Sequence, residues 1–157
     1  MSLVFGAFSR ITRAPSKSSI AHWPAISDDG RFVAFSSNCT NFVPGDTNGL
    51  ADVFVRDTCR SNGAVVPGCT ATTERVSGLA GAPDENDRVV GNVDMSADGR
   101  YVTFGAQVFP SPVTRGLVRD RLLGTSTVLN SSNVLTTRQR ISPDGRFILF
   151  SSDRSNL

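Results

Sequence analysis

The sequence predicts an all-β fold of antiparallel four-stranded sheets in one domain, residues 1–157, and three observations support this prediction. A short segment with hairpin-turn residues recurs along the chain. The run after each turn is apolar on both faces of the strand that it would form. Helical periodicity is absent, because Gly, Pro, Ser, Thr and Asn interrupt every window long enough to hold a helix.

The recurring segment has the form Ser-x-Asp-Gly-Arg, followed by an aromatic residue and a short apolar run. Its three copies occupy residues 26–36, 95–105 and 141–151. Asp-Gly is a strong hairpin signal because glycine adopts a positive φ at no steric cost. The distance between the last two copies is close to the roughly 40–50 residues of a four-stranded propeller blade.

The strand after each turn predicts stacked sheets. In the first copy, Phe32, Val33 and Phe35 place apolar side chains on both faces of the strand. An antiparallel sheet with one face in water would be polar on that face. We therefore expect sheets that are covered on both sides, as the blades of a β-propeller are, with about three blades in this chain.

The chain divides into four expected segments. In order, they are residues 1–20 (the last strands of a shared blade), 21–80 (the first full blade), 81–135 (the second blade) and 136–157 (the first two strands of the shared blade). The strands of the two full blades are expected at 21–26, 31–37, 52–57 and 72–77, and at 89–95, 101–106, 117–121 and 127–130. Those of the shared blade are expected at 3–8, 10–13, 137–141 and 147–151.

The number of expected blades also predicts an assembly. Propellers close with about four to eight blades, which is more than this chain is expected to supply. Two chains that exchange their terminal half-blades would form a six-bladed ring with two-fold symmetry and no open sheet edge. The sequence therefore predicts a homodimer that shares blades, and the alternative is a piece of a longer propeller.

Two of the three cysteines flank a turn-rich loop. Cys59 follows one strand-like run, Cys69 precedes another, and the residues between them are rich in Gly, Pro and Asn. If the two runs pair as a hairpin, the thiols face each other and can form a disulfide, which is typical of an oxidising compartment. The alternative is two unrelated buried thiols in a cytosolic protein. Cys39 is expected to be a small buried or loop residue.

The composition excludes two classes of partner. The formal net charge is only +2, the arginines are scattered, and Lys17 is the single lysine, so no basic stripe for nucleic acid exists. No apolar stretch approaches the ~20 residues of a membrane span. The apolar opening segment, residues 1–8, lacks a charged n-region. If the protein is exported, its signal is therefore not present in this chain.

One loop resembles a short calcium-binding segment. Asp46, Asn48 and Asp52 offer oxygen ligands, and Gly49 suits the turn between them. A calcium loop usually carries more carboxylates and a closing glutamate, which this loop lacks. The alternative, which the composition favours, is a connection in which the turns and Asp52 serve the backbone. Calcium is thus the one cofactor that the sequence suggests.

The remaining polar residues do not assemble a catalytic site. An aspartate precedes each turn glycine (Asp29, Asp98 and Asp144), and turn chemistry alone accounts for aspartate there. His22 is the single histidine, so a histidine-based triad or zinc site is hard to assemble. Trp23 is expected to pack between blades. The alternative is an exposed ring that stacks on a sugar, which makes Trp23 and His22 the candidate ligand-binding residues.

The repeat, followed by Asp-Val-Phe-Val-Arg-Asp at 52–57, resembles the blade signature of the TolB-like, WD-repeat-like β-propeller family of bacterial periplasmic and secreted proteins. The stretch at 40–49, Thr-Asn-Phe-Val-Pro-Gly-Asp-Thr-Asn-Gly, resembles a loop found in a subgroup of that family. The resemblance implies a closed toroid of blades, export from the cytoplasm, and recognition of a protein or polymer on an end face. It implies no chemistry.

The functional expectation follows from these points. The chain is expected to be a non-catalytic binding or assembly scaffold of an exported bacterial protein, periplasmic or secreted, that recognises a protein or a cell-envelope polymer. The alternative is the propeller portion of a larger hydrolase whose catalytic domain is absent from this chain.

Overall fold

A computed structural model describes residues 21–78, 87–108, 114–129 and 138–151, and every regular element in these ranges is a β-strand. The strands, in chain order, are β1 (Ala21–Ile26), β2 (Phe32–Ser37), β3 (Asp52–Asp57), β4 (Arg60–Ser61), β5 (Ala64–Val65), β6 (Thr73–Arg75), β7 (Asp87–Met95), β8 (Tyr101–Val108), β9 (Thr114–Asp120), β10 (Thr125–Val128), β11 (Gln139–Ile141) and β12 (Ile148–Phe150).

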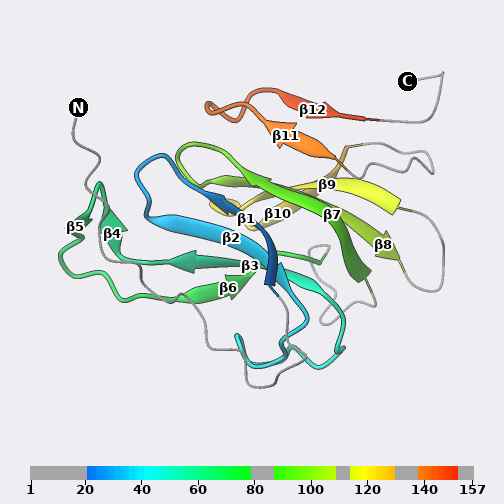
Figure 1. Ribbon diagram of the computed structural model, residues 1–157, viewed down its shortest axis with the longest axis horizontal. Coiled ribbons are helices and arrows are strands. Elements are labelled where there is room, and N and C mark those ends of the chain that lie inside the picture. The colour runs from blue at the N-terminus through cyan, green and yellow to red at the C-terminus, as the bar shows by residue number, and fades with distance from the viewer. Residues whose placement is uncertain (1–20, 79–86, 109–113, 130–137, 152–157) are drawn as a thin grey trace.

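The strands form two four-stranded antiparallel sheets and two short hairpins. The first sheet has the order β1-β2-β3-β6 and the second has the order β7-β8-β9-β10, so each is a simple meander apart from the β4–β5 insertion. The β11–β12 hairpin follows the second sheet (Figure 1). Strand β7 lies against both β1 and β11, so the first strands of successive sheets are neighbours. The expected all-β class and the antiparallel four-stranded sheets are confirmed.

The β4–β5 hairpin is an element that the sequence analysis missed. It interrupts the connection between β3 and β6, where only a turn-rich loop was expected. Asn62 and Gly63 make its turn, with φ of 51° and 83°. Positive φ at both central residues is the geometry for which Asn-Gly is the preferred pair, so the signal was present in the sequence.

The hydrophobic core lies between the two four-stranded sheets. Val53 and Val55 of β3 belong to the cluster that also contains Val102 and Phe104 of β8. These four side chains are at most 1% exposed. Burial of this kind stabilises the stack by roughly 25 cal/mol for each Å² of apolar surface removed from water.

The other face of the first sheet is covered from within its own blade. Phe35 and Phe54 stack with ring centroids 5.8 Å apart, and Phe42 meets both rings edge-on, at 5.6 and 5.1 Å. Phe42 comes from the loop between β2 and β3. The apolar residues on both faces were interpreted as a sign of sheets on either side. Among the described residues, a second sheet covers one face and this loop covers the other.

Each repeated turn is closed by the same hydrogen bonds. In the first copy the Ser27 hydroxyl donates to Asp29 (2.7 Å) and accepts from the Phe32 N–H (2.9 Å), while Asp29 accepts from the Arg31 N–H (2.9 Å). The copies that begin at Ser96 and Ser142 repeat this pattern. Because the aspartate bonds inside its own turn, the Ser-x-Asp-Gly-Arg sequence is a structural motif here.

The turns of successive sheets are joined by their backbones. The Asp28 N–H donates to the Ala97 carbonyl, and the Ala97 N–H donates to the Pro143 carbonyl, both at 2.9 Å. These three residues hold the same place in the repeat. The bonds therefore form a ladder from sheet to sheet, and Pro143, which has no N–H, cannot extend it as a donor.

The aromatic residue after each turn packs on the glycine of the next sheet. A Cβ added to Gly99 would lie 2.9 Å from Cγ of Phe32, and one added to Gly145 would lie 2.9 Å from Cε2 of Tyr101. Both glycines have φ of +72°. Glycine is thus required at these positions for two reasons, because the backbone has a positive φ and because the neighbouring ring leaves no room for a Cβ.

The two four-stranded sheets and the β11–β12 hairpin form an array in which each turn contacts the next. The two ends of this array lack the partner that the interior positions have. Phe147 holds the place of Phe32 and Tyr101, yet it is 67% exposed. Gly30 holds the place of Gly99 and Gly145, and nothing in the described residues lies within 4 Å of a Cβ added to it. One end of the described array therefore presents an aromatic side chain without a glycine, and the other presents a glycine without an aromatic side chain.

The described sheets do not close a ring. The expected strands at 3–8 and 10–13, which would complete a shared blade, lie outside the described residues. The six-bladed homodimer therefore stays a prediction. In the part of the chain that is described, no helix is long and apolar enough to cross a membrane.

Candidate binding site between the first two sheets

A pocket of about 410 Å³ opens between the first two sheets at the ends of β1, β2 and β7. Its lining includes Trp23 from β1, Asn38 after β2, Leu50 before β3, and Arg88 from β7. The Val89 N–H donates to the Ala51 carbonyl at 2.8 Å and joins β7 to the start of β3 beside the pocket. Its size lies in the range of small-ligand sites.

Trp23 reaches the pocket because β1 is irregular at this point. The register between β1 and β2 shifts between His22 and Ala25, and Trp23 has a φ of 49°. A left-handed conformation costs a residue with a side chain about 1–2 kcal/mol. A bulge of this kind turns a side chain away from its regular direction. Trp23 is 44% exposed, so the expectation that it packs between blades is wrong.

The first strand of the second sheet also has a bulge, with a different register. The register of β7 shifts between Val90 and Val93, and there Gly91 takes the positive φ, at 85°. Asn92 accepts from the Gln139 N–H (2.8 Å) and donates to its carbonyl, which fastens β7 to β11. Trp23 stands in β1 at the place of Asn92, and among the described residues no such side-chain bond joins β1 to β7. The pocket occupies this position.

The pocket rim carries charge and aromatic surface. Arg88 is exposed, and its guanidinium has no hydrogen bond or ion pair within the described residues. His22 is also exposed, and its ring lies 5.3 Å from that of Trp23. Trp23 and His22 are candidates from the sequence, whereas Arg88 carries no signal there, because only the neighbouring sheet brings Arg88 to this site.

The arginine of the turn motif is committed to its own sheet. Arg31 binds Asp57 at the end of β3, and Arg100 binds Asp120 at the end of β9, with shortest N–O distances of 2.8 and 2.7 Å. In each pair the guanidinium holds the pKa of the aspartate below its ordinary value. Arg146 instead binds the exposed Asp144 of its own turn at 2.9 Å. Arg31 and Arg100 therefore link strands of their own sheets, whereas Arg146 stays within its turn.

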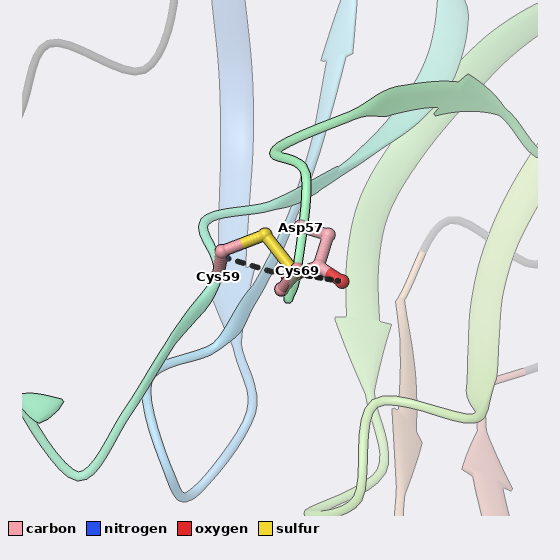
Figure 2. A group of neighbouring side chains, drawn as sticks. All are labelled: Asp57, Cys59 and Cys69. Carbon is pink, nitrogen blue, oxygen red and sulfur yellow. Dashed lines mark hydrogen bonds between the residues drawn. A yellow bond between two sulfur atoms is a disulfide. The ribbon is translucent and has the colours of Figure 1, made fainter. Parts of the chain in front are cut away.

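Cys59 and Cys69 are joined by a disulfide at the base of the β4–β5 hairpin, with Cα atoms 5.5 Å apart (Figure 2). The Cys59 N–H donates to Asp57 at 2.8 Å, so the bridge is attached to the end of β3. These three residues lie close enough to hold a metal. Their atoms are already engaged, because the sulfurs bond each other and Asp57 binds Arg31. Cys39 is buried and free.

An arginine from another strand lies beside the expected calcium loop. Asp46 and Asp52 are both buried, and the Arg75 guanidinium of β6 lies 4.0 Å from the first carboxylate and 3.8 Å from the second. Asn48 accepts from the Leu50 N–H at 2.8 Å, as in an Asx turn. The arginine supplies the positive charge that an ion would bring. This arrangement favours the turn role, and calcium binding stays a prediction.

Comparisons with known proteins bear on the fold. No protein-family model matches the chain, and no curated protein matches it. Among solved structures, TolB from Acinetobacter baumannii aligns with a TM-score of 0.57 and 20% identity, over 88% of this chain and 28% of that one. The chain has a TolB-like fold. A TolB-type protein from Agrobacterium tumefaciens aligns with a TM-score of 0.54 and 15% identity, over 90% of this chain and 42% of that one. This chain therefore spans less than half of either TolB structure.

Proposed function

We propose that this TolB-like chain is a non-catalytic binding scaffold of an exported bacterial protein, and that it recognises a protein or a cell-envelope polymer. The observation that carries the proposal is that the repeated aspartate and arginine bond within their own sheet. Asp29 closes its turn and Arg31 braces the sheet through Asp57. These charges therefore stabilise the turn and the sheet, which leaves the loops and the pocket at the surface for recognition.

The disulfide supports the exported location. Such bonds persist in oxidising compartments such as the periplasm and are rare in the cytosol. Fractionation of the source cells, with thiol labelling of the chain from each fraction, tests this part of the proposal. We expect the chain in the periplasm or the medium with Cys59 and Cys69 protected from the label. A reduced chain in the cytosol would contradict it.

The proposal includes self-assembly through the two ends of the array. The contact that Phe32 makes with Gly99 is repeated by Tyr101 and Gly145, and Phe147 and Gly30 are the unpaired halves of the same contact. A second copy of this chain carries both halves. We therefore expect Phe147 of one chain to pack on Gly30 of another, in line with the homodimer that the sequence predicts.

The binding function is tested with the oxidised full chain immobilised on a sensor surface. Envelope-protein extract and isolated cell-wall polymer of the source organism are passed over it, and the same chain, reduced, alkylated and unfolded in denaturant before it is immobilised, is the control. We expect saturable binding of one fraction, which then identifies the partner for titration. Binding that is equal to the unfolded control in both fractions would contradict the proposal.

A further inference from the structure

The pocket beside Trp23 has features of a site that is built to hold a ligand. The bulge of the second sheet places its positive φ on Gly91, one position earlier in the repeat than Trp23 and at no steric cost. The bulge of the first sheet places its positive φ on Trp23, at 49°, although a large side chain is strained in that conformation. A strained residue beside a cavity is a reason to suspect a function. What the strain achieves is a half-exposed indole in the pocket wall.

The edge of the sheet at this pocket is poorly suited to an extended peptide. Strand β1 is an edge strand of the first sheet, and a bound peptide would normally pair with such an edge through main-chain bonds. Pro24 has no N–H, and the bulge between His22 and Ala25 breaks the register. The ligand must therefore be held mainly by side chains.

The side chains of the pocket combine a flat apolar surface with hydrogen-bonding groups. Trp23 offers a wide ring, Leu50 adds apolar surface, and Arg88 offers N–H donors at the exposed rim. A sugar ring matches this combination, because its C–H face packs on an aromatic ring and its hydroxyls bond polar side chains.

The charge at the rim selects among sugars. The Arg88 guanidinium is exposed and has no partner among the described residues. A planar guanidinium binds a carboxylate through two parallel hydrogen bonds. We propose that this pocket binds a carboxylate-bearing sugar unit of an envelope polysaccharide, with Trp23 against the sugar ring and Arg88 on the carboxylate. The proposal rests on the binding function above and specifies its ligand class.

Trp23 is the single tryptophan of the chain, so its fluorescence reports this pocket alone. The oxidised full chain is titrated with tetragalacturonic acid and, separately, with its methyl ester, in which the carboxylates are neutral. We expect a saturable change in emission with the acid. The ester is expected to bind about tenfold more weakly, because it cannot form the charge-assisted bonds.

Two variants separate the site from the fold. Arg88→Gln is expected to weaken the acid about tenfold, and Arg60→Gln, which removes an exposed arginine of the β4–β5 hairpin, is the matched control and is expected to bind as the wild type does. Trp23→Gly removes the ring and relieves the backbone strain. Measured by calorimetry, it is expected to lose binding while the chain stays as stable as the wild type or becomes more stable.

The following results would overturn the proposal. The acid and the ester bind equally, Arg88→Gln behaves like Arg60→Gln, or no saturable change occurs with the acid. A peptide that competes at Trp23 when no saccharide does would assign the pocket to a protein partner instead. If one of these results is obtained and Trp23→Gly still binds the envelope fraction in the sensor experiment, only the sugar site is refuted. If the wild-type chain binds neither envelope fraction above the unfolded control, the scaffold function itself is refuted.

Discussion

The contact between Phe32 and Gly99 allows the docking of one sheet on the next to be measured. Gly99→Ala adds a methyl group 2.9 Å from Cγ of Phe32, in a backbone conformation with φ of +72°. Gly30→Ala adds the same group in the same kind of turn, at φ of +74°, where no described atom lies within 4 Å. The two substitutions therefore share the conformational cost and differ in the clash with the neighbouring sheet.

The expected magnitudes follow from these two terms. Gly30→Ala is expected to lower the free energy of unfolding by about 1–2 kcal/mol, which is the cost of a side chain in the left-handed region. Gly99→Ala adds an overpacking cost of about 1–3 kcal/mol, since the ring that it meets is anchored between sheets. Each kcal/mol lowers the melting temperature by about 2–4 °C in a chain of this size.

Urea denaturation followed by circular dichroism measures both variants. In a Phe32→Ala background the ring is gone, so the extra cost of Gly99→Ala is expected to fall by most of its value. This is the coupling that a double-mutant cycle isolates. If Gly99→Ala and Gly30→Ala destabilise the chain equally, the ring does not dock on the glycine and the account of sheet packing is wrong.

Three further predictions concern the stability of the first blade. Reduction of the Cys59–Cys69 bridge is expected to lower the free energy of unfolding by about 3 kcal/mol in the chain-entropy model, which urea denaturation measures. Intact mass with and without reductant checks that the bridge exists, and three free thiols in the non-reduced chain would contradict it. Asp46→Ala and Asp52→Ala are each expected to cost about 1 kcal/mol, with or without calcium; a wild-type melting curve that millimolar calcium leaves unmoved would remove the metal hypothesis and keep the turn role. Hydrogen bonding to its guanidinium partner lowers the pKa of Asp57 below 3.8, so the unfolded chain binds the proton more readily and stability is lost as the pH falls below that value; a urea midpoint that is flat from pH 5 to pH 2.5 would contradict this.

Local turn chemistry made much of the fold predictable. Asp-Gly at 29–30, 98–99 and 144–145 marked three turns, and each has the same internal bonds in the structure. The strands on either side followed from their apolar residues. The same type of signal at Asn62-Gly63 was present and was not used, so the β4–β5 hairpin was missed although the sequence carries it.

The candidate site was less predictable because it depends on contacts between sheets. Trp23 and Arg88 are far apart in the sequence and meet only where β7 lies beside β1. The exposure of Trp23 follows from a bulge in β1, in which neither Trp23 nor Pro24 pairs with a residue of β2. Neither the bulge nor the positive φ of Trp23 has a signal in sequence periodicity. An aromatic residue in an apolar strand is most simply interpreted as core.

The central claim of this account is that the ends of the array are docking surfaces for another blade, and light scattering after gel filtration tests it most directly. The oxidised chain at micromolar concentration is expected to have twice the mass of one chain. Phe147→Asp is expected to shift it to the monomer, whereas Leu123→Asp, at a site with the same 67% exposure in the turn between β9 and β10, is expected to leave the dimer intact. A stable, well-folded wild-type monomer, or equal effects of the two substitutions, would contradict the claim.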